Sequence, residues 1–211
     1  MGRARGIHPE GLAGGLRGPD FLVSETHLGI AIAAASPTGL CWLAFGDHRP
    51  TLVDALLRRF PGALEAPPAT GDLQERALAA VDHPAGPHDL PLDLRGTPFQ
   101  LQVWAALRRI PPGSTIAYAE LARRVGRPRA TRAVAQACGA NPVGVLVPCH
   151  RVIASDGNLG GFAFGTARKA ALLRREGLSL WMRATSFYRG LAVPSLSASP
   201  LGSPRPLRNR C

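Results

Sequence analysis

The chain has 211 residues, of which 45% are hydrophobic, and a formal net charge of +11. This is about one and a half times the roughly 150 residues of an average domain, so one large domain or two small ones are expected. The apolar content excludes wholesale disorder. No stretch approaches the roughly 20 consecutive apolar residues of a membrane span, so no membrane partner is expected.

Charge is distributed unevenly along the chain. Residues 1–94 contain 7 arginines and 11 acidic residues, residues 95–177 have a net charge of +10, and residues 178–211 add five arginines and no acid. A weakly acidic first half joined to a strongly basic second half indicates that the second half meets a polyanion, and we expect nucleic acid. Solubility alone is the alternative, but it does not require such segregation.

The cysteines indicate the redox environment. They are widely separated, with no Cys-x-x-Cys pair and no histidine pair at zinc-ligand spacing: Cys41, Cys138, Cys149 and Cys211. Neither a disulfide framework nor a structural metal is expected. The first residues are rich in Gly and Arg and lack the apolar core of a signal peptide, so we expect a cytoplasmic protein with reduced thiols.

The first half of the chain has the pattern of a small α/β domain, which we place at residues 20–92. Two apolar runs, Leu28–Ala35 and Leu40–Phe45, are separated by a Ser-Pro-Thr-Gly turn and predict a β-hairpin. Thr51–Phe60 and Asp72–Val81 carry apolar residues at helical spacing and predict two helices.

Three segments are predicted to be irregular. Residues 1–19 have the composition of a flexible end and residues 179–211 that of a disordered basic tail, because neither can bury enough apolar surface to fold alone. Residues 84–91 predict a linker, which leads to a second domain at residues 93–178.

The second domain is predicted to begin with helices. Thr97 followed by Pro98 predicts an N-cap and a helix that runs to about Arg109. Tyr118–Val125 and Ala130–Cys138 predict two short helices, each ended by a glycine. Such a pair has the form of a helix-turn-helix, in which the second helix contacts DNA, and three arginines of this segment support the interpretation: Arg127, Arg129 and Arg132. Many helix pairs share the spacing, so the pattern alone does not decide the question.

An apolar run, Val143–Val147, leads into Cys149 and predicts a strand that carries the cysteine. A buried cysteine is more often an inert thiol. Here His150 and Arg151 follow directly, and both can favour a thiolate. Neighbouring side chains of an extended chain point to opposite faces, so the imidazole would reach the sulfur only through a bridging water.

His150 would then need a third group to fix its tautomer, as in catalytic triads. Asp156 lies in a Ser-Asp-Gly-Asn turn of ordinary type. Glu176 follows the predicted Ala167–Arg175 helix, where an acid is poorly placed for the helix dipole, so a specific partner would explain it. Position alone favours the simpler alternative for Glu176, a surface pair with an arginine.

The sequence resembles a known family. The Pro-Cys-His-Arg-Val motif at residues 148–152 is the active-site signature of the O6-alkylguanine-DNA alkyltransferases, the methylated-DNA–protein-cysteine methyltransferases. The resemblance covers residues 20–178 and looks closest to the catalytic half of bacterial Ada-type proteins, whose zinc domain and regulatory module have no counterpart here. Further motifs stand in the right order: Arg95–Gln100, Val103-Trp104, Tyr118, Arg132–Val134, Asn141-Pro142 and Arg168–Gly177.

The resemblance implies the fold class and the chemistry. The fold would be α/β (α+β), with a small N-terminal ribonuclease-H-like α/β domain followed by a winged-helix-like helix-turn-helix catalytic domain, and no cofactor or metal is expected. Cys149 would accept the alkyl group from O6 of guanine once and irreversibly, with O4-methylthymine left open as a second substrate. His150, a water and Glu176 would generate the thiolate, and Tyr118 would donate toward the guanine ring.

The resemblance also implies how the base is held. Four residues would surround it or support its pocket: Val152 through its main chain, Phe162, Ala163 through an N–H that faces O6, and Asn141 in a structural role at the turn before Cys149. The base must leave the stack to reach a buried cysteine. Arg132 would enter the duplex in its place.

The expected partner is double-stranded DNA that contains O6-alkylguanine, bound by a monomer in a bacterial cytoplasm, at the nucleoid. Arg127 and Arg129 suit phosphate contacts, which would make affinity strongly dependent on salt. Thr131 and Ala133 complete the expected DNA contacts, since Ala133 is small enough for a close approach to the minor groove.

Two residues depart from the family pattern. Phe162 stands where tyrosine is usual, so a hydroxyl near the leaving oxygen is missing. Ala117 replaces a capping serine before Tyr118, which should weaken the start of that helix by about 1 kcal/mol. Two other functions stay open: a non-enzymatic damage sensor, opposed by the presence of Cys149, and a transcriptional regulator, opposed by the missing regulatory module.

Overall fold

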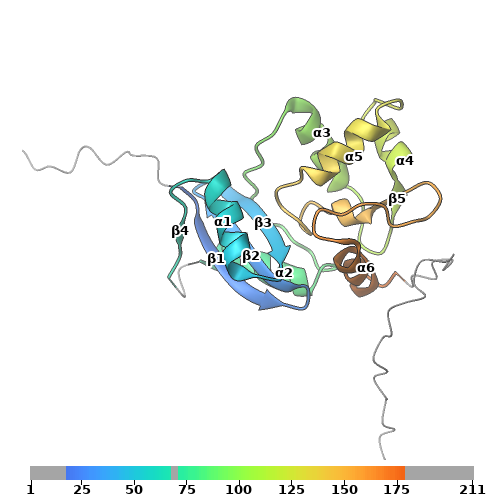
Figure 1. The fold of residues 1–211 in the computed structure, drawn as a ribbon. Coiled ribbons are helices and arrows are strands. Elements are labelled where there is room, and N and C mark those ends of the chain that lie inside the picture. Colours follow the sequence, from blue (N-terminus) through green and yellow to red (C-terminus); the bar gives the residue numbers. More distant parts are fainter. Residues whose placement is uncertain (1–17, 68–70, 179–211) are drawn as a thin grey trace, which may run out of the picture. The chain divides into compact units, whose positions relative to one another are not determined.

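The structure is a computed structural model that describes residues 18–67 and 71–178, all within one structural unit. Apart from residues 18 and 19, the predicted flexible end lies outside the described residues, as does the predicted basic tail. The strands are β1 (Asp20–Thr26), β2 (Gly29–Ser36), β3 (Gly39–Gly46), β4 (Leu64–Glu65), β5 (Ile116–Ala117) and β6 (Val152–Ile153) (Figure 1). The helices are α1 (Arg49–Arg59), α2 (Asp72–Asp82), α3 (Pro98–Leu107), α4 (Tyr118–Arg124), α5 (Thr131–Gly139), α6 (Thr166–Arg175) and the 3-10 helix η1 (Cys149–Arg151).

The first half forms a four-stranded sheet of order β3-β2-β1-β4. The predicted hairpin is confirmed as β2 and β3, which pair antiparallel from Ile30 opposite Gly46 to Ser36 opposite Gly39. β1 pairs antiparallel with β2, and the short β4 runs parallel to β1. Sequence analysis missed β1, whose exposed Ser24-Glu25 pair interrupts the apolar pattern of a strand.

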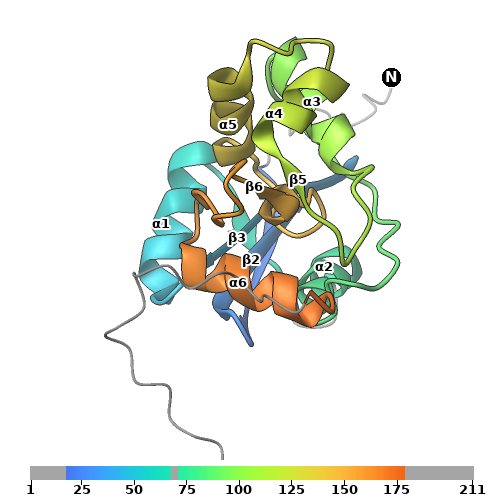
Figure 2. The same ribbon diagram turned by 90° about the vertical axis from the view of Figure 1, so that its right-hand side faces the viewer.

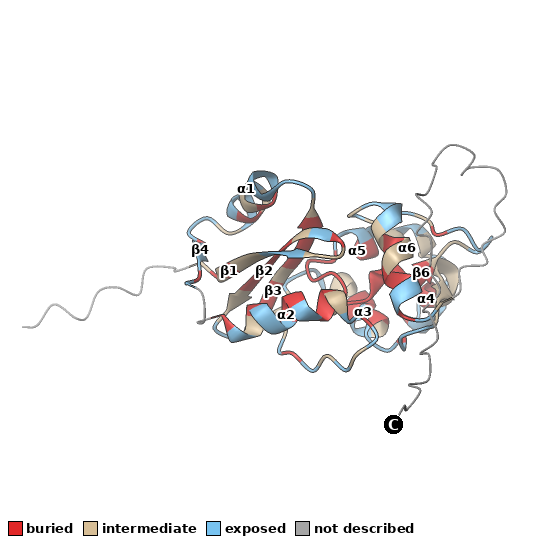
Figure 3. Cartoon of the chain, turned by 90° about the horizontal axis from the view of Figure 1, so that it is seen from below, coloured by how far each residue is buried: buried red, intermediate tan, exposed pale blue. Residues whose placement is uncertain are grey.

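Helices α1 and α2 cover opposite faces of this sheet (Figure 3). Successive residues of β2 alternate between the faces, so that Ile32 packs in the cluster that contains Leu56 of α1, and Ala33 in the cluster that contains Val81 of α2. Both helices confirm the prediction. α1 begins at Arg49 rather than residue 51, because proline is tolerated in the first helical turn.

The apolar cluster on the α2 side of the sheet continues into α3, α4 and α5. Trp104 is buried there, and its indole N–H donates to the carbonyl of Ala137 at 2.9 Å. α3 begins with a capping box, in which the Thr97 hydroxyl accepts from the Gln100 N–H and the Gln100 side chain accepts from the Thr97 N–H. The helix ends at Leu107, slightly before the predicted Arg109. The fold is therefore mixed α/β, and the predicted boundary between residues 92 and 93 stays a prediction.

The predicted strand that carries Cys149 is wrong. Val143 forms only an isolated bridge with Leu43 of β3, and a turn follows in which Val145 has a φ of 66°. Pro142 and Pro148 flank this segment and lack the N–H groups that a strand needs, so the chain turns and enters η1 instead. β5 and β6 pair in parallel and lie between the helix pair α4–α5 and helix α6 (Figure 2).

No helix within the described ranges has the length and apolar character needed to cross a membrane.

Candidate active site

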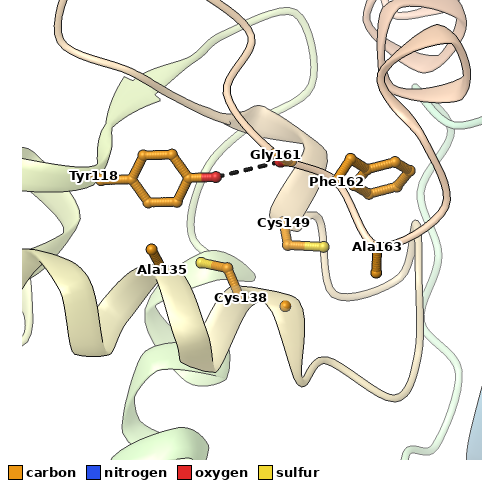
Figure 4. Close-up of a pocket in the computed structure, with 8 residues that line it drawn as sticks. Tyr118, Ala135, Cys138, Cys149, Gly161, Phe162 and Ala163 are labelled. Atoms are coloured by element: carbon orange, nitrogen blue, oxygen red, sulfur yellow. Dashed lines mark hydrogen bonds between the residues drawn. The ribbon is translucent and has the colours of Figure 1, made fainter.

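A cavity of about 270 Å3 opens beside Cys149. Its wall is formed by α4, α5, η1 and the loop before α6 (Figure 4): Tyr118, Ala135, Cys138, Gly139, Cys149, Gly161, Phe162 and Ala163. Four predicted site residues, Cys149, Tyr118, Phe162 and Ala163, are thus brought together. The second helix of the predicted helix-turn-helix forms one side of the same cavity, so the expected DNA-binding and chemical elements share a wall.

His150 is fully buried and hydrogen-bonded on one side only. Its Nε2–H donates to Glu176 Oε1 at 2.7 Å. Its Nδ1 is also buried and has no hydrogen-bond partner among the described residues. Because the carboxylate accepts from Nε2, the lone pair is on Nδ1, where a proton can be accepted. The 3-10 turn, rather than an extended chain, sets the direction of this ring relative to Cys149.

Glu176 is buried, so the favoured interpretation of it as a surface pair is wrong. It stands at the C-cap of α6 and turns inward to His150 and to Arg151, whose Nη2 lies 2.8 Å from Oε1. Arg151 is itself buried and donates to the carbonyls of Ile110 and Pro84. It therefore anchors Glu176, a role that the sequence did not indicate. Burial raises the pKa of Glu176, but hydrogen bonds from His150 and Arg151 outweigh burial, so the net pKa is lowered and the group is a carboxylate.

Burial disfavours the charged forms of both Cys149 and His150. Burial raises the pKa of the Cys149 thiol, although hydrogen bonding from Asn141 and the charge of Lys169 oppose this. Burial lowers the pKa of His150, and the hydrogen bond to Glu176 opposes that shift. These two shifts favour a neutral thiol and a neutral imidazole.

Asn141 and Val152 are buried beside Cys149, and neither lines the cavity. The Asn141 amide donates to the Val147 carbonyl at 2.7 Å and to Cys149 Sγ at 3.2 Å. Its Oδ1 accepts from the Val143 N–H at 3.0 Å. The predicted structural role of Asn141 at this turn has support in these contacts, and one of them is a direct contact with the Cys149 sulfur.

Lys169 is the residue that sequence analysis passed over. It is fully buried, and its Nζ donates at 2.5 Å to the carbonyls of Val152 and Leu159. Burial lowers its pKa to about 8. The signal was present, because Lys169 is the only lysine of the chain and lies within a motif of the resemblance. The carbonyl of Val152 keeps a second lone pair for another donor.

Tyr118 reaches across the cavity. Its hydroxyl donates to the Gly161 carbonyl at 3.4 Å, a long hydrogen bond that a better acceptor can replace (Figure 4). Burial raises the pKa of Tyr118 to about 12, so it remains a donor at neutral pH. The second cavity thiol, Cys138, has a pKa raised to about 12 by burial. Cys138 was not predicted as a site residue.

Asp156 lies in the turn that was predicted for it, where its carboxylate accepts from the Asn158 N–H and side-chain amide, away from His150. In the part of the chain that the structure describes, no group of three His, Cys, Asp or Glu residues is placed to hold a metal ion.

The arginines on α4, on α5 and in the turn between them are of two kinds: some pair with an acidic residue and others do not. Arg123 and Arg124 both contact Glu120. The predicted DNA contacts are exposed, and no acidic side chain of the described residues pairs with any of them: Arg127, Arg129 and Arg132. Thr131 and Ala133 of α5 are partly exposed. Gly126, with a φ of +68°, makes the turn between the helices.

The sequence is similar to a family model and to proteins of known function. Residues 98–178 match the family model described as 6-O-methylguanine DNA methyltransferase, DNA binding domain. The chain is 44% identical over 161 residues to the bifunctional transcriptional activator/DNA repair enzyme Ada of Escherichia coli, covering 74% of this chain and 45% of that protein. It is 56% identical over 85 residues to a methylated-DNA–protein-cysteine methyltransferase of Salmonella typhimurium, covering 40% of this chain and 50% of the relative. The chain thus spans about half the length of these curated relatives.

The fold is also similar to solved structures. The crystal structure of Mycobacterium tuberculosis OGT in complex with DNA superposes with a TM-score of 0.64 at 35% sequence identity, covering 74% of this chain and 92% of that one. The M. tuberculosis O6-methylguanine methyltransferase superposes with a TM-score of 0.62 at the same identity.

Proposed function

This chain belongs to the O6-methylguanine-DNA methyltransferase family, and we propose that it repairs DNA by transferring the alkyl group of O6-alkylguanine to Cys149, once per molecule. The observation that carries the proposal is the buried His150–Glu176 pair beside the cavity cysteine, with Nδ1 of the histidine left as a proton acceptor.

The reaction is an in-line displacement at the alkyl carbon. Cys149 gives its proton to Nδ1 of His150 through a water, and the imidazolium is stabilised by the Glu176 carboxylate, which accepts at 2.7 Å. The thiolate then forms the S–C bond as the bond from carbon to O6 breaks. The guanine anion that leaves takes up one proton, so a thiol and an alkylated base become a thioether and guanine. The thioether has no leaving group to reverse the step, and the protein is consumed.

Three groups compensate the negative charge on the departing base. Tyr118 retains its proton, because burial raises its pKa to about 12, and it can exchange its long bond to Gly161 for one to the base. The N–H of Ala163, a residue of the cavity wall, faces O6 in the proposed complex. Lys169 adds a positive charge 5.9 Å from the Tyr118 ring.

DNA approaches from α5 in this proposal. A base within the stack cannot enter a cavity whose nucleophile is buried, so the nucleotide is flipped out and Arg132 fills its place. Arg127 and Arg129 contact phosphates, with Thr131 and Ala133 close to the minor groove. Asn141 supports the turn before Cys149, the main-chain carbonyl of Val152 accepts from the exocyclic amine of the guanine, and Phe162 packs against the base.

The finer description of fold and setting belongs to the same proposal. The order β3-β2-β1-β4 with β4 parallel to β1 supports a ribonuclease-H-like first part. The α4–α5 pair with the small β5-β6 sheet supports a winged-helix-like second part. We propose that the protein acts as a monomer on double-stranded DNA, in the bacterial cytoplasm at the nucleoid.

The test is the incubation of the protein with a duplex that carries labelled O6-methylguanine. One label per molecule on Cys149, and none on Cys149→Ala with duplex binding retained, is the expected result. Cys138→Ala is the matched control, since that thiol lines the same cavity and its loss should leave labelling intact. Repeated turnovers, label on another residue, or binding without transfer by the unsubstituted protein would refute the proposal.

A further inference from the structure

The loop before α6 carries the cavity-wall residues Phe162 and Ala163 and is held at both ends by neighbouring cations of α6. Lys169 Nζ donates to the Leu159 carbonyl at 2.5 Å and to the Gly161 carbonyl at 3.3 Å, before the wall residues. Arg168 Nη1 donates to the Phe164 carbonyl at 3.1 Å, after them. Hydrogen bonds from Lys169 and Arg168 therefore fix the loop on both sides of Phe162 and Ala163.

Arg168 also reaches the N-terminal sheet. Its Nε donates to the Leu28 carbonyl, in the turn between β1 and β2, at 2.6 Å. Its Nη2 lies 2.5 Å from Asp47 Oδ1, directly after β3. One guanidinium therefore joins the loop before α6 to two segments of the N-terminal sheet, a role that suits a planar group with several donors. Its side chain is 19% exposed, and its two carbonyl contacts are part-buried, whereas its contact with Asp47 is exposed.

An aromatic contact runs beside this junction. Phe164 packs edge-to-face on Phe45 of β3, with ring centroids 5.0 Å apart, and on Phe162, at 5.4 Å. Gly144 leaves room for it, since a Cβ there would lie 2.9 Å from the Phe45 ring and 3.2 Å from the Phe164 ring. Packing and hydrogen bonding thus connect the cavity wall to the same strand.

We propose that Arg168 is a positioning residue for alkyl transfer, through which the N-terminal sheet sets the position of the cavity wall opposite Cys149. The inference rests on the proposed function, because it concerns the same cavity. A wall that drifts misplaces the base relative to sulfur, and displacement reactions are sensitive to errors of that size. The His150–Glu176 pair is held by Arg151, which does not contact Arg168. The pair should therefore stay in place when Arg168 is replaced.

The three contacts of Arg168 should contribute unequally to the position of the loop. Asp47 is 75% exposed, and ion pairs with such a partner contribute little. The two carbonyl contacts are only part-buried but link the loop directly to the sheet. Arg168→Ala should therefore change the reaction much more than Asp47→Asn. Arg168→Lys keeps the charge but cannot bridge both carbonyls, so it should be intermediate.

The experiment measures methyl transfer from a duplex with O6-methylguanine in single turnover, with protein in excess over DNA. Arg168→Ala should lower the limiting rate roughly tenfold, with the half-saturating protein concentration unchanged within about twofold. Alkylation of Cys149 by iodoacetamide, located by mass spectrometry of its peptide, should not change. Arg49→Ala is the matched control, since Arg49 of α1 also pairs with a carboxylate, that of Glu65 on β4.

The outcomes separate this inference from the proposed function. An active unsubstituted protein with an unchanged limiting rate in Arg168→Ala overturns the inference alone. Equal losses in transfer and in iodoacetamide reactivity also overturn it, because they indicate general damage. If Arg168→Ala does not fold, Arg168→Lys decides the matter by the same criteria. An unsubstituted protein that accepts no methyl group overturns the proposed function as well.

Discussion

Replacement of Glu176 by glutamine isolates the charge of the buried carboxylate from its shape. Arg151 would lose its ionic partner but keep the carbonyls of Ile110 and Pro84. The loss of one partner of a buried ion pair costs about 3–5 kcal/mol of folding free energy, and these carbonyls argue for the lower figure. The imidazolium of His150 would lose a charge-assisted hydrogen bond worth about 1–2 kcal/mol more than a neutral one, which corresponds to transfer roughly 5- to 30-fold slower.

The pH dependence gives a sharper criterion than the rate alone. His150 must be neutral to accept the thiol proton, so transfer falls as the pH drops through its pKa, which burial lowers and Glu176 raises. In Glu176→Gln the raising contribution is gone. The acid limb of the rate profile should therefore move to lower pH while the plateau falls.

The assay is single-turnover methyl transfer across the pH range in which both proteins are folded, with thermal unfolding measured at each pH. Glu120→Gln is the matched control, because Glu120 also pairs with two arginines but is partly exposed, on α4. If the plateau rate of Glu176→Gln is unchanged, or if the acid limb of its rate profile moves to higher pH, then proton transfer through His150 and Glu176 is refuted.

Three further predictions concern other parts of the site. Arg132→Ala should slow repair in duplex DNA far more than reaction with free alkylguanine, because the proposed function gives Arg132 a role only in the duplex; equal losses on both substrates would contradict base flipping by this residue. Asn141→Ala removes a hydrogen bond that lowers the pKa of Cys149. Iodoacetamide alkylation of Cys149 should then require higher pH, and stability should fall by about 2–3 kcal/mol, as measured by urea unfolding. Ala117→Ser supplies the missing cap of α4, where no side-chain cap is present, and should add about 1 kcal/mol, or about 2–4 °C in Tm, in calorimetry; an unchanged Tm would mean that the serine hydroxyl does not cap the helix.

Local patterns predicted the elements that local forces determine. The β2–β3 hairpin follows from two apolar runs around a turn, and α3 follows from Thr97 and the proline after it, which the structure completes with Gln100. η1 could not be predicted in this way, because the apolar run before Cys149 has the composition of a strand. Its two prolines and the pairing of Val143 with β3 decide its path, and the latter is a long-range contact.

In the candidate site, too, some residues could be predicted from local patterns and others depend on long-range contacts. Cys149 and His150 were identified from adjacent residues, whereas the inward turn of Glu176 depends on Arg151, which is fixed by carbonyls 41 and 67 residues away in the chain. No periodicity contains that information. Resemblance to a family supplied the expected role of Glu176, whereas its position alone favoured a surface pair. Lys169 was missed because a lysine in a basic helix is ordinarily a solvent-exposed charge.

The burial of Lys169 makes the cavity wall observable by simple amine chemistry. Its ε-amine is enclosed by the loop whose carbonyls it binds, so an acylating reagent can modify it only when that loop opens. Because the chain has no other lysine, an acylated lysine side chain can only be Lys169, and its peptide is distinct from the acylated N-terminus. The rate at which Lys169 is acylated therefore reports how often the wall beside Cys149 opens, without any label attached to the site.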